Sequence, residues 1–253
     1  MDIEHSENQI NELTEELNQR TREIEILKQD IELLTHSFSN DLRAPLRSIN
    51  GFSKIIESEY GKTLDEEGRR LLKIVRDNST RMGVLIDELL NFSRLGRKSL
   101  NYEVVDFKKL AEDAAAVAGK ILNNKDIFKI DSLLPSYADK ALILEVWKNL
   151  IANAVKFTAG LENPHIHIGC EANDIEIKYY VADNGVGFNM NHIGKLFGIF
   201  QRLHSVDDYS GNGIGLALCE KIIRMHGGTI SAESIQNQET VFSFTIPNKI
   251  KIN

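Results

Sequence analysis

The sequence predicts an α+β protein in which a long helical part precedes a compact α/β sandwich domain. Apolar residues follow a heptad repeat from residue 10 to 38, and short β-rich runs alternate with helical runs from about residue 101 onward. We therefore expect three regions: a coiled-coil helix at 1–37, a helical hairpin at 38–97 and the sandwich domain at 101–253.

The first region has the spacing of a two-stranded parallel coiled coil. Its apolar residues recur at alternating steps of three and four, and the positions between them are mostly charged or amide side chains. The seam consists of Ile10, Leu13, Leu17, Arg20, Ile24, Leu27, Ile31, Leu34 and Phe38, with Arg20 as its single polar member. A lone amphipathic helix packed on its own domain is the alternative, but so narrow a seam favours the coiled coil.

The second region reads as two helices, because the apolar pattern runs over 42–56, breaks at 59–68 and resumes over 71–92. Such an antiparallel hairpin has too little core to be stable alone. A second copy would supply the missing core in a four-helix bundle, so we expect a homodimer.

Two local features refine this hairpin. Pro45 lies inside the first helix and should kink it, because proline removes a backbone donor. Thr63 followed by Glu66 could form a capping box that opens the second helix.

The third region mixes strands and helices. The expected strands are Tyr102–Val105, Ile127–Ile130, His165–Cys170, Ile175–Ala182, Thr229–Ala232 and Thr240–Ile246. The expected helices are Phe107–Leu122, Lys140–Phe157 and Ile214–His226.

Composition argues against several classes of function. A formal net charge of −7 disfavours nucleic acid as a partner, since phosphate binding needs an excess of Lys and Arg. No apolar run approaches the roughly 18 residues of a membrane span, and residues 1–9 are polar, unlike a signal peptide. Cys170 and Cys219 lack metal-ligand spacing, so we expect reduced thiols in a cytoplasmic protein.

Two polar clusters in the third region suit a metal and a base. Asn149, Asn153 and Lys156 share one helix face and could hold Mg²⁺ and phosphates, or could be an ordinary solvated face. Asp183, followed by Gly185 and Gly187, ends an apolar strand. Its carboxylate could accept a hydrogen bond from an exocyclic amine, although an ordinary turn would have the same residues.

Two further clusters suit phosphates and a lid. Gly211, Gly213 and Gly215 precede a helix, where backbone N–H groups and the helix dipole attract phosphate; a flexible loop is the alternative. The segment Phe197–Arg202 lies in a long connection and could be a lid, with Arg202 as a phosphate contact; core packing of its phenylalanines is the alternative.

Taken together and in this order, the four clusters resemble the signature boxes of sensor histidine kinases of two-component systems. Asn149–Thr158 is similar to the N box, Asp183–Phe188 to the G1 box, Phe197–Arg202 to the F box and Gly211–Leu216 to the G2 box, although Asn212 stands where the family more often has Thr or Ser. The resemblance extends over residues 36–247. It implies a dimerization and histidine-phosphotransfer domain followed by a Bergerat-type ATP-binding domain.

The resemblance also implies specific roles. ATP and Mg²⁺ are the implied ligands, with Asn153 on the Mg²⁺, Lys156 near the phosphates, Phe157 beside the adenine and Asp183 on the adenine amine. Asn149, Gly185, Gly187, Arg202, Gly211, Gly213, Gly215 and Leu216 are expected in the same site. The implied partners are a response regulator receiver domain and a sensor domain upstream of this chain.

Residues 38–47 are similar to the family's H box, F-S-H-D-L-R-A-P-L-R, but Asn40 stands at the phosphoacceptor position. An amide nitrogen is not basic and cannot attack a γ-phosphate as imidazole does. Asp41 matches the general base. His36 lies one helical turn earlier, about 6 Å away along the axis, which argues against it as a displaced acceptor.

Two functions therefore stay open. The chain is the core of a histidine kinase whose acceptor has been replaced, which abolishes the autophosphorylation expected of the family, or it is an ATP-binding pseudokinase adaptor whose output is conformational. A third possibility, another Bergerat-fold ATPase of the chaperone or mismatch-repair type, is disfavoured by the D-L-R-A-P-L sequence in the hairpin.

Overall fold

The computed structural model describes residues 2–96, 99–122, 127–201, 203 and 211–249, and it divides into two compact units at 1–96 and 97–253. The first unit is helical and the second contains all the described strands. None of the described helices is long and apolar enough to cross a membrane.

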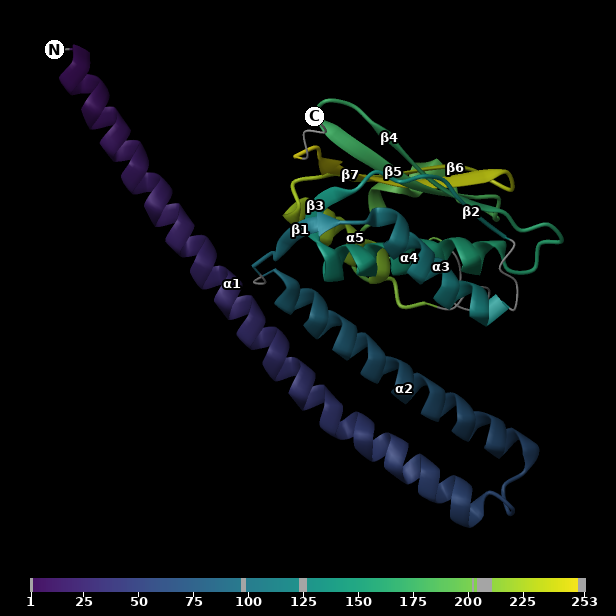
Figure 1. Cartoon of the computed structure of the whole chain (residues 1–253). Helices are drawn as coiled ribbons and strands as arrows, with labels where there is room; N and C mark the ends of the chain where they lie inside the picture. The colour runs from purple at the N-terminus through teal and green to yellow at the C-terminus, as the bar shows by residue number, and fades with distance from the viewer. Residues whose placement is uncertain (1, 97–98, 123–126, 202, 204–210, 250–253) are drawn as a thin grey trace. The chain divides into compact units, whose positions relative to one another are not determined.

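The first unit is an antiparallel hairpin of two long helices (Figure 1). Helix α1 spans Asp2–Ile55 and continues through Pro45, and the π-helical turn η1 follows at Ile56–Tyr60. Helix α2 spans Glu66–Leu95. The predicted capping box is wrong: Asp65 is the N-cap, and its carboxylate accepts a hydrogen bond from the Gly68 N–H at 2.7 Å.

Thr63 does not cap α2, although the sequence had predicted that it would. Its hydroxyl donates backward to the carbonyl of Tyr60 at 2.8 Å, so it stabilises the end of the preceding turn. Both hydroxyl and carboxylate residues cap helices well, and only the turn geometry decided between Thr63 and Asp65.

Few apolar side chains are buried within this single hairpin. Leu46, Ile86 and Leu90 form its buried cluster, and the Ser79 hydroxyl donates to the carbonyl of Leu46 at 3.1 Å. Large apolar side chains that stay exposed include Leu42, Ile49, Phe52, Leu71, Val75 and Met82. On the described part of the heptad seam, Leu13, Leu17, Ile24, Leu27, Ile31, Leu34 and Phe38 are exposed as well.

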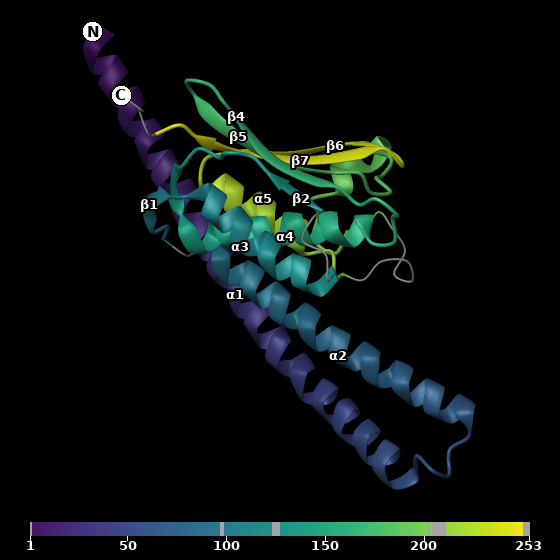
Figure 2. The same cartoon turned by 45° about the vertical axis from the view of Figure 1, so that its right-hand side comes forward.

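The second unit is a two-layer sandwich. Its main sheet has the order β2-β4-β5-β7-β6, parallel between β2 and β4 and antiparallel elsewhere. These strands are β2 (Phe128–Ile130), β4 (Ile166–Ala172), β5 (Glu176–Asp183), β6 (Ile230–Ile235) and β7 (Glu239–Pro247). Helices α3 (Phe107–Leu122), α4 (Lys140–Thr158) and α5 (Gly215–Met225) cover one face of that sheet (Figures 1 and 2).

The predicted elements of this unit agree with the structure to within three residues at each end. Two short elements were not predicted: strand β3 (Ser136–Asp139), which pairs with β1 (Tyr102–Val105) in a separate two-stranded sheet, and the 3₁₀ helix η2 (Met190–Lys195). Both are too short to carry a readable hydrophobic period, so only their tertiary contacts define them.

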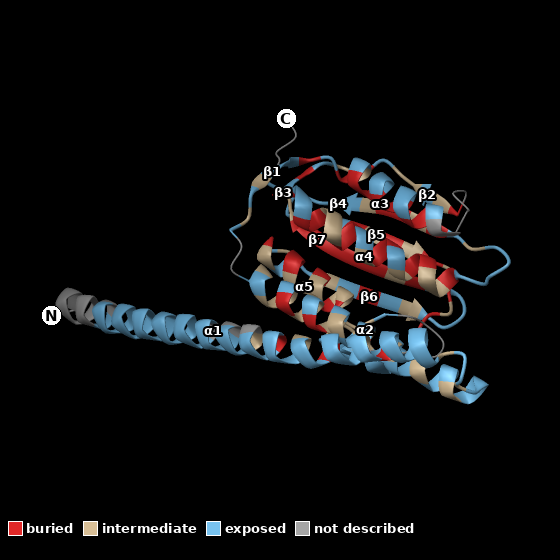
Figure 3. Cartoon of the chain, turned by 90° about the horizontal axis from the view of Figure 1, so that it is seen from below, coloured by how far each residue is buried: buried red, intermediate tan, exposed pale blue. Residues whose placement is uncertain are grey.

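Aromatic packing between the layers holds α4 against the sheet. The Phe107 and Tyr179 rings stack at 4.3 Å between centroids, and Trp147 of α4 meets Phe244 of β7 at 5.2 Å. Figure 3 shows the buried residues concentrated where these helices face the sheet. The buried face of α4 is therefore fixed in the core, which leaves its polar stripe at the edge of the unit.

Candidate functional site

The polar stripe of α4 is half-buried at the C-terminal half of the helix. Asn149, Asn153 and Lys156 are partly exposed, whereas Leu150 and Ala154 between them are buried. The Asn149 amide donates to the carbonyl of Glu145 at 2.8 Å, which turns its Oδ1 toward the start of α5. No described residue hydrogen-bonds the Asn153 amide, so its oxygen is available to a hard cation.

Asp183 ends β5 as a buried carboxyl group, only 3% exposed. Its Oδ1 accepts a hydrogen bond from the Gly185 N–H at 2.9 Å. Burial raises the pKa of Asp183 to about 6; the Gly185 N–H opposes the shift and the negative charge of Glu239 adds to it. A buried carboxylate with a free oxygen is a strong acceptor for an amine donor.

Gly185 lets the loop after β5 reach the end of α4. A Cβ atom at this position would lie 2.6 Å from the carbonyl oxygen of Phe157, which is too close for any other residue. The Val186 N–H donates to that same carbonyl at 3.3 Å. Asp183 and Phe157 are thereby held side by side, although they are far apart in the sequence.

The glycines before α5 approach the same edge. A Cβ at Gly215 would lie 2.4 Å from Asn149 Oδ1, so α5 begins directly against the stripe of α4, with Leu216 half-buried in its first turn. A Cβ at Gly211 would lie 3.5 Å from Lys156 Nζ, and the same ammonium lies over the Phe157 ring at 4.1 Å from its centroid.

The segment predicted as a lid meets the glycine loop. The Phe200 N–H donates to the carbonyl of Gly213 at 2.9 Å, and both residues have positive φ angles, 60° and 73°. Neither Phe197 nor Phe200 is buried, so core packing does not account for them. Arg202, the predicted phosphate contact, lies outside the described residues.

Asn184, which the sequence reasoning passed over, ties a neighbouring loop to this site. Its side chain accepts from the His165 N–H and donates to the carbonyl of Asn163, both at 2.8 Å. The loop after α4 is therefore anchored beside Asp183. A small amide between an aspartate and a glycine gives no local signal for such a role.

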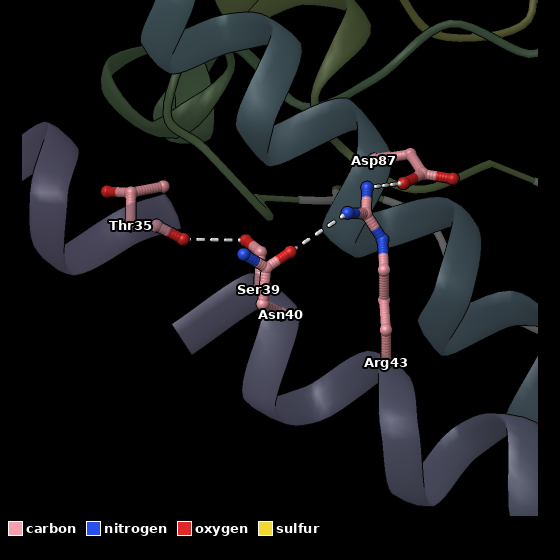
Figure 4. A network of polar contacts seen from close by, with 5 residues as sticks. All are labelled: Thr35, Ser39, Asn40, Arg43 and Asp87. Carbon is pink, nitrogen blue, oxygen red and sulfur yellow. Dashed lines mark hydrogen bonds and ion pairs between the residues drawn. The ribbon is translucent and has the colours of Figure 1, made fainter. Parts of the chain in front are cut away.

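The predicted acceptor position lies in the other unit, on α1. Figure 4 shows the side chain of Asn40 near that of Arg43, whose Nη1 is 3.5 Å from Asn40 Oδ1, while Arg43 also pairs with Asp87 of α2. Asn40 and Asp41 are exposed, so a group at position 40 is accessible to a partner domain. The side chain of His36, the displaced-acceptor alternative, lies outside the described residues.

Family comparisons agree with this architecture. Residues 31–98 match the His Kinase A (phospho-acceptor) domain, and residues 138–250 match the histidine kinase-, DNA gyrase B- and HSP90-like ATPase family. The chain therefore carries a phospho-acceptor domain followed by an ATPase domain, and these two domains in this order support a sensor histidine kinase.

Known relatives are much longer than this chain. Cyanobacterial phytochrome B of Nostoc sp. is 37% identical over 223 residues, which are 86% of this chain and 29% of that protein. Sensor protein kinase WalK of Staphylococcus haemolyticus is 28% identical over 225 residues, 84% of this chain and 36% of that protein. The chain thus corresponds to about a third of the length of these relatives.

Solved structures share the fold. Full-length ShkA in complex with AMPPNP gives a TM-score of 0.61 at 24% identity, over 84% of this chain and 45% of that one. Histidine kinase ThkA in complex with the response regulator protein TrrA gives 0.59 at 24% identity, over 87% of this chain and 62% of that one.

Proposed function

We propose that this chain is the catalytic core of a two-component sensor histidine kinase in which the ATP site is intact and the acceptor position is occupied by Asn40. The convergence of three segments carries the proposal. Asp183, the stripe of α4 and the glycines before α5 meet at one edge of the sheet, where a buried amine acceptor adjoins groups suited to phosphates.

The side chains fit ATP with Mg²⁺ as its counter-ion. Asp183 would accept from the adenine amine, Phe157 would contact the ring, and Lys156 together with the N–H groups of Gly211–Gly215 would meet the phosphates. Asn153, with Asn149 beside it, would hold Mg²⁺, which neutralises charge on the phosphates when bound. This assignment follows from the side chains on the stripe of α4, which are the amide oxygens of Asn149 and Asn153 and the ammonium of Lys156.

Position 40 separates the two candidate outputs. In the family, ATP phosphorylates a histidine at this position and the phosphoryl group passes to a response regulator. Asn40 provides no basic nucleophile, and Asp41 has no imidazole to activate, so we expect no autophosphorylation of this chain. The second candidate, an ATP-binding adaptor whose output is conformational, rests on the same observation, the amide side chain at position 40.

The same proposal includes a homodimer. The exposed seam of α1 and the exposed apolar residues of the hairpin need a partner surface, and a second copy of this chain offers the matching one. A response regulator receiver domain and an upstream sensor domain would be the other partners.

Transfer of the γ-phosphoryl label from ATP tests this proposal. The parent chain and Asn40→Ala should incorporate none, whereas Asn40→His should become labelled in an acid-labile form. Label in the parent chain would disprove the role of position 40. An unlabelled Asn40→His chain that still binds ATP would instead favour the adaptor.

A further inference from the structure

The β6–β7 hairpin holds the loop that follows Asp183 in place. The Phe188 N–H donates to the Ser234 hydroxyl at 3.0 Å, and the Asn237 N–H donates to the carbonyl of Val186 at 3.0 Å. The Phe188 ring is itself buried, with its centroid 6.3 Å from that of Phe242 of β7. This loop is therefore attached to the β6–β7 hairpin at three points.

At Gly187 the loop lies very close to the β6–β7 hairpin. Its φ is +63°, and a Cβ atom there would lie 2.6 Å from the Ser234 hydroxyl oxygen. The hydroxyl occupies the space that a side chain would need, so only glycine permits this contact. Ser234 thus contacts the loop directly at Gly187 and limits the path that its backbone can take.

Ser234 is in turn held by β7. Its hydroxyl lies 2.9 Å from that of Thr240, which is buried and pairs in register with Asp183. The Ser234 hydroxyl therefore connects the Phe188 end of the loop to β7, the strand that pairs with β5 at Asp183.

We propose that Ser234 is a positioning residue for the nucleotide site, holding the Asp183–Phe188 loop in the conformation that receives the base. The inference rests on the proposed ATP-binding function and adds to it a residue outside the four signature clusters. Because the loop is already held in this conformation, less conformational entropy is lost when the nucleotide binds. Loss of the Ser234 hydroxyl should therefore lower nucleotide affinity. Ser234 acts through the loop backbone and need not touch the nucleotide.

Ser231 offers a matched control on the same strand. Its hydroxyl lies 2.9 Å from that of Ser243 of β7, so Ser231→Ala also removes a hydroxyl pair between β6 and β7. Residues 231 and 234 differ by an odd number along a strand and so face opposite sides of the sheet. A purely structural role for such pairs would affect both variants alike.

The test uses the whole chain as parent, Ser234→Ala and Ser231→Ala. Calorimetry with ATP and with ADP, each with Mg²⁺, should show Ser234→Ala losing about 3–10-fold in affinity, the range that one hydrogen bond supplies. The loss should be equal for the two nucleotides, because the loop adjoins the base site. Hydrogen exchange without nucleotide should become faster at the Phe188 amide in Ser234→Ala only.

Each outcome has a distinct meaning. Ser234→Ala that binds ATP as tightly as the parent, or Ser231→Ala that loses as much, overturns this inference and leaves the proposed function in place. A parent chain that binds no ATP overturns the proposed function and this inference with it.

Discussion

At the scale of single residues, two buried titratable groups have opposite pKa shifts. Asp183 at the end of β5 has a raised pKa, because burial disfavours its charge. His226, the C-cap of α5, has a lowered pKa, again chiefly because of burial, with the positive charge of Lys249 adding to the shift. Each shift gives a pH dependence that can be assigned to one side chain.

For Asp183 we predict that nucleotide binding weakens as pH falls below 6. The folded pKa of about 6 lies above the unfolded value of 3.8, so Asp183 contributes stability at low pH that is lost as pH rises from about 4 to 6. Nucleotide affinity should instead rise with pH, because the adenine amine would donate its hydrogen bond to the ionised carboxylate of Asp183.

Calorimetry across this range should show about a tenfold loss in affinity between pH 7 and pH 5 in the parent chain. Asp183→Asn should bind about 1–3 kcal/mol more weakly at pH 7 and lose this dependence, whereas Asp174→Asn, at an exposed turn, should bind as the parent does. Asp183→Asn binding as tightly as the parent would refute the assignment.

For His226 we predict a contribution to stability that requires the neutral ring. Its Nε2 accepts from the Asp139 N–H at 3.0 Å, and its Nδ1 lies 2.7 Å from the carbonyl of Ile222, which can only accept. A protonated ring would place two donors against each other at Asp139. Because the folded pKa is lowered, this stability is fully present above the unfolded value of 6.5 and is lost as pH falls from there toward the folded pKa.

Thermal unfolding of the parent and of His226→Gln at pH 7.5 and pH 6.0 measures this contribution. The difference in unfolding temperature between the parent and His226→Gln should be smaller at pH 6.0 than at pH 7.5. A difference that is unchanged or larger would rule out a requirement for neutral His226.

At the scale of elements, α1 is one continuous helix that passes from the heptad region through Asn40 and Pro45 into the hairpin. A movement applied to its N-terminal part must pass Asn40, the predicted acceptor position. Pro45 lacks the N–H that would bond the carbonyl of Asp41, so bending costs less there than elsewhere in the helix.

We predict that Pro45→Ala straightens α1 and shifts the balance between two hairpin arrangements. The substitution restores a helix hydrogen bond and stabilises the straight form by up to about 3 kcal/mol. In an Asn40→His background it should change the rate of label transfer and leave ATP affinity unchanged, since the two sites lie in different units. An unchanged rate of label transfer, or equal changes in this rate and in ATP affinity, would contradict bending of α1 at Pro45.

At the scale of the whole molecule, the first unit exposes more large apolar side chains than it buries. So many exposed large apolar side chains are uncommon on the surface of a monomer. The second unit, by contrast, has a closed aromatic core of its own. We therefore expect association through the helices and nucleotide binding by the sandwich.

We predict a parallel dimer that depends on the heptad seam. Light scattering at micromolar concentration should give twice 28.6 kDa. Leu27→Asp, on the seam, should weaken the dimer, whereas Ile26→Asp, off the seam, should not, although the two side chains are 60% and 58% exposed in the single chain. A monomeric parent, or equal effects of both variants, would refute the coiled coil.

Much of the fold could be read from the sequence because its elements are long or strongly patterned. Phe107–Leu122 was predicted residue for residue, since its alanines and leucines repeat along one face. Strand β3 and the Asp65 cap were missed, since four residues carry no period and several side chains can cap one turn.

The sequence by itself determined the order of the candidate clusters and the presence of Asn40, because both depend only on which residues follow one another. Tertiary structure decided which groups meet. Gly185 against Phe157, Gly215 against Asn149 and Gly187 against Ser234 are contacts between distant segments. Such contacts depend on how α4 and α5 pack on the sheet and on how β6 pairs at its edge, and the spacing of residues along the chain does not determine either arrangement.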